Sequence, residues 1–223
     1  MLSMHQIARS SAARLLALLP DGRQKPEEEV VAYGLEIALG ALLQLLVFYV
    51  AGCCLGLLPE MMAALFTMAT YRLLAGGVHC SAYYRCLLLS LLTLILLASL
   101  GRWLAGMSGR YLPGAILAVF VASMAVAWRW APAPTAAAPI VNPVRRAWLK
   151  KASYLWLLAW LAVIGPGYYL GWPGSALYAS TGALIFQSFA VTPWGFATVG
   201  RVDALLKRLL PLDKNWKEGG DIL

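Results

Sequence analysis

CLLLSLLTLILLASLG, residues 86–101, is the stretch of sequence that decides the fold. It contains no charged side chain and consists mainly of leucine and isoleucine. A bilayer core of about 30 Å needs about 20 residues of helix, and somewhat fewer where the helix is interfacial. The stretch therefore predicts a helix at membrane depth.

The composition of the whole chain agrees with this interpretation. Of its 223 residues, 61% are hydrophobic and 13% are charged, whereas a soluble domain is about 45–50% apolar and about 25% charged. We predict an integral membrane protein that forms a single membrane domain over residues 1–223. In such a protein a net charge of +8 indicates topology and contact with anionic lipid rather than binding of nucleic acid.

Other apolar runs resemble the first in composition. They cover residues 35–58, 60–75, 111–128, 153–171 and 174–192. Together with residues 86–101 they predict an all-α, polytopic integral membrane protein with about six membrane helices between residues 30 and 195. The runs 60–75 and 86–101 are short, so either of them could instead be a re-entrant or interfacial helix.

Both ends of the chain have an amphipathic pattern. In residues 1–20 the apolar side chains recur at helical spacing, with Arg9 and Arg14 off that face. This pattern predicts a helix that lies on the membrane surface. The tail, residues 196–223, repeats the pattern, with leucines on one side and basic residues on the other.

The basic residues predict an orientation. With six crossings and a cytosolic N-terminus, the cytosolic segments contain 16 of the 18 lysines and arginines, as the positive-inside rule requires. Those segments are residues 1–34, 72–85, 129–152 and 193–223. We therefore predict a multi-pass protein of the cell membrane with both termini, and the segment that precedes Cys86, at the cytosolic face.

That segment contains an imidazole and a thiol, His79 and Cys86, shortly after Gly76-Gly77. Ionisable groups close to hydrocarbon indicate a functional site, and a cysteine with a histidine in reach is the minimum for nucleophilic catalysis. On one straight helix the two would lie about 10.5 Å apart along the axis. Proton transfer needs about 3 Å, so the chain must bend between them, and Gly76-Gly77 supplies conformational freedom.

The surrounding residues suggest how the thiol is activated. Ser81 is a candidate N-cap for a helix that carries Cys86 in its early turns, and the positive end of a helix dipole favours the thiolate. The alternative is that Cys86 only packs and His79 is a polar anchor. We predict a structural role for Cys80, with a side chain directed elsewhere. Cys53 and Cys54 are predicted to be buried, and the cysteine spacing predicts neither a zinc site nor a structural disulfide.

Three more polar residues are candidates for supporting roles. Arg72 could hold a substrate carbonyl or carboxylate, or it could reach lipid phosphate. Glu36 could orient His79, pair with Arg72 or face water. Gln187 fits an interhelical hydrogen bond.

The segment 129–152 is predicted to be a proline-rich, basic cytosolic loop. Its cations could determine topology and bind lipid phosphate, or they could bind substrate. They are Arg145, Arg146, Lys150 and Lys151.

At these residues the chain resembles the accessory gene regulator B (AgrB) family, the membrane endopeptidases of Gram-positive quorum sensing. The family pattern is an arginine, then Gly-Gly-x-His, then a cysteine seven residues after the histidine. Here these are Arg72, Gly76-Gly77, His79 and Cys86. A second match is an Ala-Pro and a Pro-Ile, at residues 131–132 and 139–140, followed by the basic group. The resemblance covers about residues 30–195, and Cys80 departs from it.

The resemblance implies that Cys86 is the nucleophile and His79 the general base and acid, with Arg72, Gly76 and Gly77 supporting them. It implies cleavage of an AgrD-like propeptide through a thioester and closure to a cyclic thiolactone or lactone. Neither a cofactor nor a metal is expected, and a homodimer is possible by analogy. From the residues alone, a small membrane transporter or exporter without protease activity is the alternative.

Overall fold

Helices form nearly all of the regular structure in the residues that the computed structural model describes, which are 4–18, 27–107, 109–135 and 139–209. The chain divides into two units, one up to Val50 and one that begins at Ala51. A single membrane domain over residues 1–223 stays a prediction.

The first unit contains α1 (Met4–Ala17) and most of α2 (Glu28–Leu55). Ala8 and Ala12 of α1 are buried, and Arg9 forms an ion pair of 3.8 Å with Glu28 at the start of α2. The predicted helix at residues 1–20 is therefore present, while its position on a membrane surface stays a prediction.

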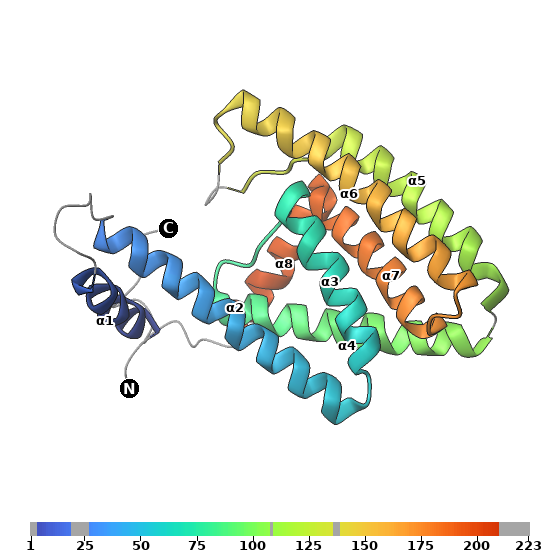
Figure 1. The fold of residues 1–223 in the computed structure, drawn as a ribbon, viewed down its shortest axis with the longest axis horizontal. Coiled ribbons are helices and arrows are strands. Elements are labelled where there is room, and N and C mark those ends of the chain that lie inside the picture. The colour runs from blue at the N-terminus through green and yellow to red at the C-terminus, as the bar shows by residue number, and fades with distance from the viewer. Residues whose placement is uncertain (1–3, 19–26, 108, 136–138, 210–223) are drawn as a thin grey trace. The chain divides into compact units, whose positions relative to one another are not determined.

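The second unit contains six α-helices and a short 3-10 helix among the described residues (Figure 1). They are α3 (Leu58–Ala75), α4 (Tyr83–Met107), η1 (Gly109–Tyr111), α5 (Leu112–Trp130), α6 (Pro143–Tyr169), α7 (Gly174–Val191) and α8 (Pro193–Leu209). Each apolar run predicted from the sequence lies in a helix. The tail helix α8 is also present, and its contact with a membrane surface stays a prediction.

The start of α6 differs from the prediction. We expected a helix from residue 153 and a basic loop before it, but α6 begins at Pro143. The side-chain oxygen of Asn142 accepts hydrogen bonds from the backbone N–H groups of Val144 and Arg145, at 2.9 and 3.3 Å. An asparagine cap followed by proline is a strong helix start, so the basic residues lie on the first turns of a helix.

Four helices in the described residues are long and apolar enough to cross a membrane. They are Glu28–Leu55, Tyr83–Met107, Gly109–Trp130 and Pro143–Tyr169. The protein is thus an all-helical membrane protein, but six crossings are not confirmed, because α3 and α7 are not in this set. Both are shorter, and both contain polar side chains, such as Glu60 and Arg72 in α3 and Gln187 in α7.

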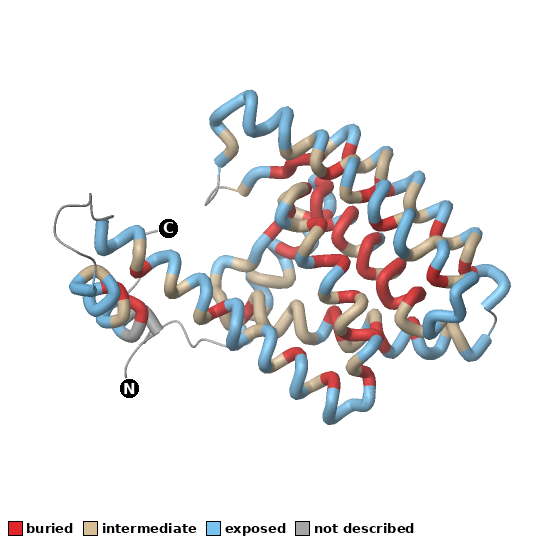
Figure 2. Tube along the Cα trace, in the orientation of Figure 1, coloured by how far each residue is buried: buried red, intermediate tan, exposed pale blue. Residues whose placement is uncertain are grey.

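Helix α7 lies at the centre of the second unit and contacts α3, α4, α5, α6 and α8. Eleven of its 18 residues are buried, and Figure 2 shows this concentration of buried residues. A helix that is enclosed by other helices needs less hydrophobicity than one that faces lipid. The polar side chains of α7, such as Gln187 and Ser188, are therefore enclosed by other helices.

Small residues let α4 and α7 approach closely. A Cβ atom on Gly101 of α4 would lie 2.6 Å from the carbonyl oxygen of Ser175 and 2.8 Å from the backbone nitrogen of Ala179. Close backbone approach at glycine is typical of helix pairs in membranes. The crossing fixes α4, which carries Cys86, against the central helix.

Candidate active site

The chain bends sharply between α3 and α4, as the sequence predicts. Helix α3 ends at Ala75, and the next two residues have positive φ angles, +72° at Gly76 and +130° at Gly77. Helix α4 then begins at Tyr83. L-residues with side chains rarely adopt such angles, so both glycines are needed to reverse the chain.

Residues 76–82, which connect α3 to α4, form the site loop. Backbone hydrogen bonds hold it to two distant segments. Ala133 donates to the carbonyl of Ala75 at 2.9 Å, and Gly77 donates to the carbonyl of Ala133 at 3.3 Å. Val78 donates to the carbonyl of Ala190, at the end of α7, at 3.1 Å. The site loop is therefore fixed between the proline-rich segment and α7.

The bend brings the predicted catalytic pair together. His79 Nδ1 lies 3.9 Å from Cys86 Sγ, within hydrogen-bonding range for sulfur. His79 is exposed and Cys86 is half-buried in the first turn of α4. The positive end of that helix favours a thiolate at this position. The expectation that the two residues meet across a bend is confirmed.

Arg72 lies against the other side of the imidazole. Its Nε donates to His79 Nε2 at 3.3 Å, its Nη1 donates to the side chain of Gln187 at 3.4 Å, and its Nη2 donates to the carbonyl of Val78. The two roles predicted for Arg72, a bond to substrate and a bond to lipid phosphate, stay predictions. In the structure its guanidinium bonds to His79, Gln187 and the site loop. The arginine is thus part of the site.

This contact sets the tautomer of the imidazole. A neutral imidazole has one donor and one acceptor nitrogen. Because the guanidinium donates to Nε2, the proton of a neutral His79 is on Nδ1 and faces Cys86 Sγ. This arrangement matches a Cys86 thiolate that accepts a hydrogen bond from Nδ1.

Gln187 supports the bend from the central helix. It is fully buried, and its Nε2 donates to the carbonyl of Gly76 at 2.8 Å while its Oε1 accepts from Arg72. The predicted interhelical hydrogen bond of Gln187 is confirmed in kind. Its partners, the bend and the arginine, could not be read from the sequence.

Sequence reasoning missed a second cluster, which lies behind Cys86. Asp203 of α8 accepts hydrogen bonds from Arg85 Nε at 2.8 Å and from Ser81 Oγ at 2.6 Å. Arg85 is 2% exposed and also donates to Ser81 Oγ at 2.7 Å. Burial alone raises the pKa of the Asp203 carboxyl, but the hydrogen bonds from Ser81 and Arg85 outweigh it and hold that pKa below its ordinary value.

The expected cap by Ser81 is wrong. Helix α4 begins at Tyr83, and Cys86 N–H donates to the carbonyl of Ala82 at 3.1 Å. The Ser81 hydroxyl donates to Asp203 instead. The Ser81 oxygen accepts from Arg85 Nη2 at 2.7 Å, so this hydroxyl joins the ion pair between Arg85 and Asp203.

The predicted direction of the Cys80 side chain is also wrong. It lies beside Cys86, and its interaction with the Cys86 sulfur raises the pKa of the Cys80 thiol. Both cysteines line a small cavity of about 30 Å³ with Arg72, Val78 and other residues. Cys53 and Cys54 differ from the prediction as well, since both are exposed.

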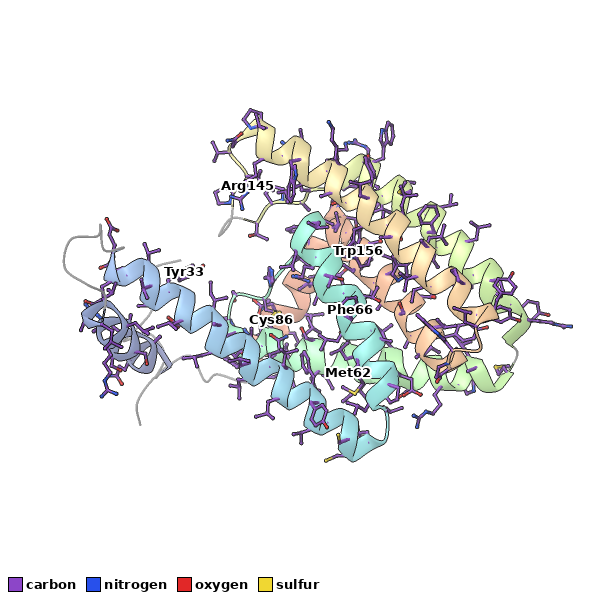
Figure 3. All side chains as sticks on the ribbon, viewed as in Figure 1. Tyr33, Met62, Phe66, Cys86, Arg145 and Trp156 are labelled. Carbon is purple, nitrogen blue, oxygen red and sulfur yellow. The ribbon has the colours of Figure 1, made fainter. Side chains whose placement is uncertain are left out.

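Other predicted residues lie elsewhere. Glu36 is on the part of α2 that belongs to the first unit, so its predicted role stays a prediction. Arg145 and Arg146 are exposed at the start of α6, and Figure 3 shows Arg145 well apart from Cys86. Lys150 donates to the carbonyl of Trp128 at 2.8 Å, and Lys151 is exposed.

A larger cavity, of about 410 Å³, is apolar and lies between α3, α6 and α7. Phe66, Trp156 and Trp160 line it, and neither His79 nor Cys86 does. Among the described residues, no group of histidines, cysteines and carboxylates has an arrangement that could hold a metal ion. The larger cavity is therefore separate from His79 and Cys86.

These features define an all-helical membrane protein with a cysteine–histidine site between two helices. The chain belongs to the accessory gene regulator B (AgrB) family, whose sequence model matches residues 12–190. It is also similar to a protein of Clostridium beijerinckii described as AgrB-like, with 25% identity over 131 residues. That match covers 59% of this chain and 62% of the relative. No solved structure matches the chain.

Proposed function

We propose that this protein is a membrane cysteine endopeptidase that processes an AgrD-like propeptide in quorum sensing. One observation carries the proposal: Cys86 Sγ and His79 Nδ1 lie 3.9 Å apart, His79 in the non-helical site loop and Cys86 in the first turn of α4. Membership of the AgrB family supports the substrate class. The site would face the cytosol, as the distribution of basic residues predicts.

The proposed reaction begins at sulfur. The Cys86 thiolate attacks a peptide carbonyl, the C–N bond breaks, and a thioester to Cys86 forms. With its own ring proton on Nε2, His79 takes the thiol proton at Nδ1 and gives it to the leaving amine. A thioester keeps much of the activation of the peptide bond, so a cysteine or serine of the bound peptide can displace Cys86 and close a thiolactone or lactone ring.

Arg72 has a role in this cycle. In the structure it donates to His79 Nε2, which keeps the ring proton on Nδ1, the nitrogen that must receive the thiol proton. A substrate carbonyl or carboxylate offers the guanidinium a stronger or additional acceptor. We propose that Arg72 turns towards the bound peptide and so releases Nε2, which couples substrate binding to proton transfer.

The start of α6 provides a surface for the substrate's charge. The exposed cations Arg145 and Arg146, with Lys150 and Lys151 nearby on the same helix, suit an acidic C-terminal tail of a propeptide. Complementary charge of this kind increases the association rate and sets orientation. Because Arg145 lies apart from Cys86, the tail would bind at a distance from the scissile bond.

The test is cleavage of a candidate propeptide by the full chain in liposomes that contain anionic lipid. Wild type should cleave, and the variants Cys86→Ala and His79→Ala should not. The matched controls are Cys53→Ala and Cys54→Ala, which remove exposed thiols and should retain cleavage. Cleavage that survives Cys86→Ala would reject the nucleophile, and transport of the peptide without cleavage would favour an exporter.

A further inference from the structure

The site contains a second thiol that the proposed peptidase reaction does not use. Cys80 lies in the site loop next to His79, and it is half-buried. Its side chain and that of Cys86 line the same cavity of about 30 Å³, and interaction with the Cys86 sulfur raises the pKa of the Cys80 thiol. Two cysteines in contact, one of them placed as a thiolate, are the components of a reversible oxidation site.

We propose that Cys80 and Cys86 form a redox-sensitive site, in which a hydroperoxide oxidises Cys86 and Cys80 captures the product as an intramolecular disulfide. Cys86 is then blocked as a nucleophile until a dithiol reduces the bond. The modification would protect Cys86 from further, irreversible oxidation.

The chemistry balances in two steps. First, the Cys86 thiolate attacks the terminal oxygen of the hydroperoxide, an S–O bond forms, the O–O bond breaks, and the other oxygen leaves after protonation as water from hydrogen peroxide or as an alcohol from an organic hydroperoxide. Sulfur is oxidised by two electrons and the peroxide is reduced. Second, Cys80 sulfur attacks Cys86 sulfur, an S–S bond forms, the S–O bond breaks, and the hydroxide leaves as water with the thiol proton.

The surroundings assign different roles to the two thiols. Cys86 is in the first turn of α4, with His79 and Arg72 on one side, and thiolate character determines which cysteine reacts with peroxide. The hydrogen bond to Cys86, followed by burial, raises the pKa of the Cys80 thiol, so Cys80 stays protonated. Once Cys86 is oxidised, its sulfur no longer carries a negative charge. The charge that kept the Cys80 thiol protonated is then removed.

The backbone permits the small movement that bond formation needs. Cys80 is outside the helices, two residues after Val78, whose backbone is anchored to α7. Cys86 is held on α4, so the approach of the two sulfurs comes from rotation of the Cys80 side chain. A disulfide in the cytosol is ordinarily transient and regulatory. At the predicted cytosolic face, a bond between Cys80 and Cys86 would be of this reducible kind and not a structural disulfide.

The sequence offers a direct assay, because Arg85 separates the two cysteines. Trypsin cleavage after Arg72, Arg85 and Arg102 places Cys80 in the peptide 73–85 and Cys86 in the peptide 86–102. The full chain, with Cys53→Ser and Cys54→Ser to remove the other thiols, is reconstituted in vesicles, treated with hydrogen peroxide, digested and analysed by mass spectrometry.

We expect a cross-linked pair of these two peptides, with a loss of two hydrogens, that dithiothreitol separates. In the matched variant Cys80→Ser we expect no cross-link and roughly tenfold more sulfinate or sulfonate on the peptide 86–102 at the same peroxide dose. The result that overturns the proposal is a wild-type chain in which Cys86 accumulates these acids as fast as in Cys80→Ser, with Cys80 still reduced.

These readouts do not depend on the proposed peptidase function. A chain that forms the cross-link but never cleaves a propeptide would support the redox site and reject the peptidase. A chain that cleaves a propeptide but forms no cross-link would support the peptidase and reject the redox site. If Cys80→Ser fails to fold, the cross-link in the wild-type chain and its reversal by dithiothreitol still decide the proposal.

Discussion

The site loop and the first turns of α6 are both polar regions at the ends of apolar helices, yet they are built in opposite ways. The site loop, residues 76–82, is bonded to segments far away in the chain, at Ala133, Ala190 and Asp203. The start of α6 is exposed, and its Asn142 cap is a local contact. Chemistry needs fixed distances, whereas attraction of a charged peptide needs only accessible charge.

The largest expected effect tests the chemical side of this comparison. His79→Ala should reduce cleavage by at least about 10³-fold, because proton transfer and thiolate stabilisation are lost together. The protein should remain folded, since His79 is exposed. The measurement is the single-turnover cleavage rate in liposomes beside the thermal unfolding midpoint. An intact rate would remove His79 from the mechanism.

The second prediction breaks the bend. Gly76→Ala should lower the free energy of unfolding by about 2–4 kcal/mol and remove most activity, because a side chain at φ +72° is strained and its Cβ meets the carbonyl of Ala133. Gly56 is the matched control: its φ is +62°, but nothing lies within 4 Å of an added Cβ.

Gly56→Ala should therefore show only the backbone strain, about 1–2 kcal/mol. Chemical denaturation in detergent measures both variants. Equal losses at the two positions would contradict the view that contact with Ala133 holds the site loop.

The third prediction concerns the ion pair behind Cys86. Asp203→Asn should lower the free energy of unfolding by about 2–3 kcal/mol, since it leaves the buried Arg85 guanidinium without its anion. The matched control is Glu28→Gln, whose ion pair with Arg9 joins side chains that are 47% and 65% exposed. That change should cost less than about 0.5 kcal/mol.

The same pair predicts a pH dependence. The pKa of Asp203 is below its ordinary value in the folded chain, so its ionised form is favoured by folding. The stabilisation is complete above the unfolded pKa of about 3.9 and is lost as the pH falls through the lower folded pKa. Unfolding midpoints of wild type and Asp203→Asn should therefore converge below about pH 4, and a constant difference down to pH 2 would contradict the assignment.

The smallest expected effect tests the other region. Arg145→Gln with Arg146→Gln should raise KM for an acidic propeptide by roughly threefold to tenfold and leave kcat nearly unchanged, because charge at a distance acts on association. The effect should shrink at high salt. Arg110→Gln, a cation near the start of α5, is the control and should change neither constant.

The helices and the approach of His79 to Cys86 could be predicted because they depend on local information. Apolar runs indicate helices. The seven-residue separation of His79 and Cys86 is too long for contact on one straight helix, so contact between the two side chains requires a bend. Asp203 and Ala133 could not be predicted, since their roles depend on which segments pack beside the site loop. The direction of Cys80 was predicted wrongly, because side chains of consecutive residues usually point in different directions. After the two positive-φ glycines, the loop instead directs Cys80 towards α4.

The composition of α7 has a consequence for biogenesis. A helix with Gln187 and several buried hydroxyl side chains gains little by entering lipid alone, and its position depends on packing with neighbours. During synthesis, α3, α4, α5 and α6 all leave the ribosome before it. The surfaces that receive α7 therefore exist when it emerges, and the catalytic bend, which is bonded to Gln187 and Ala190, is completed only when this late helix docks.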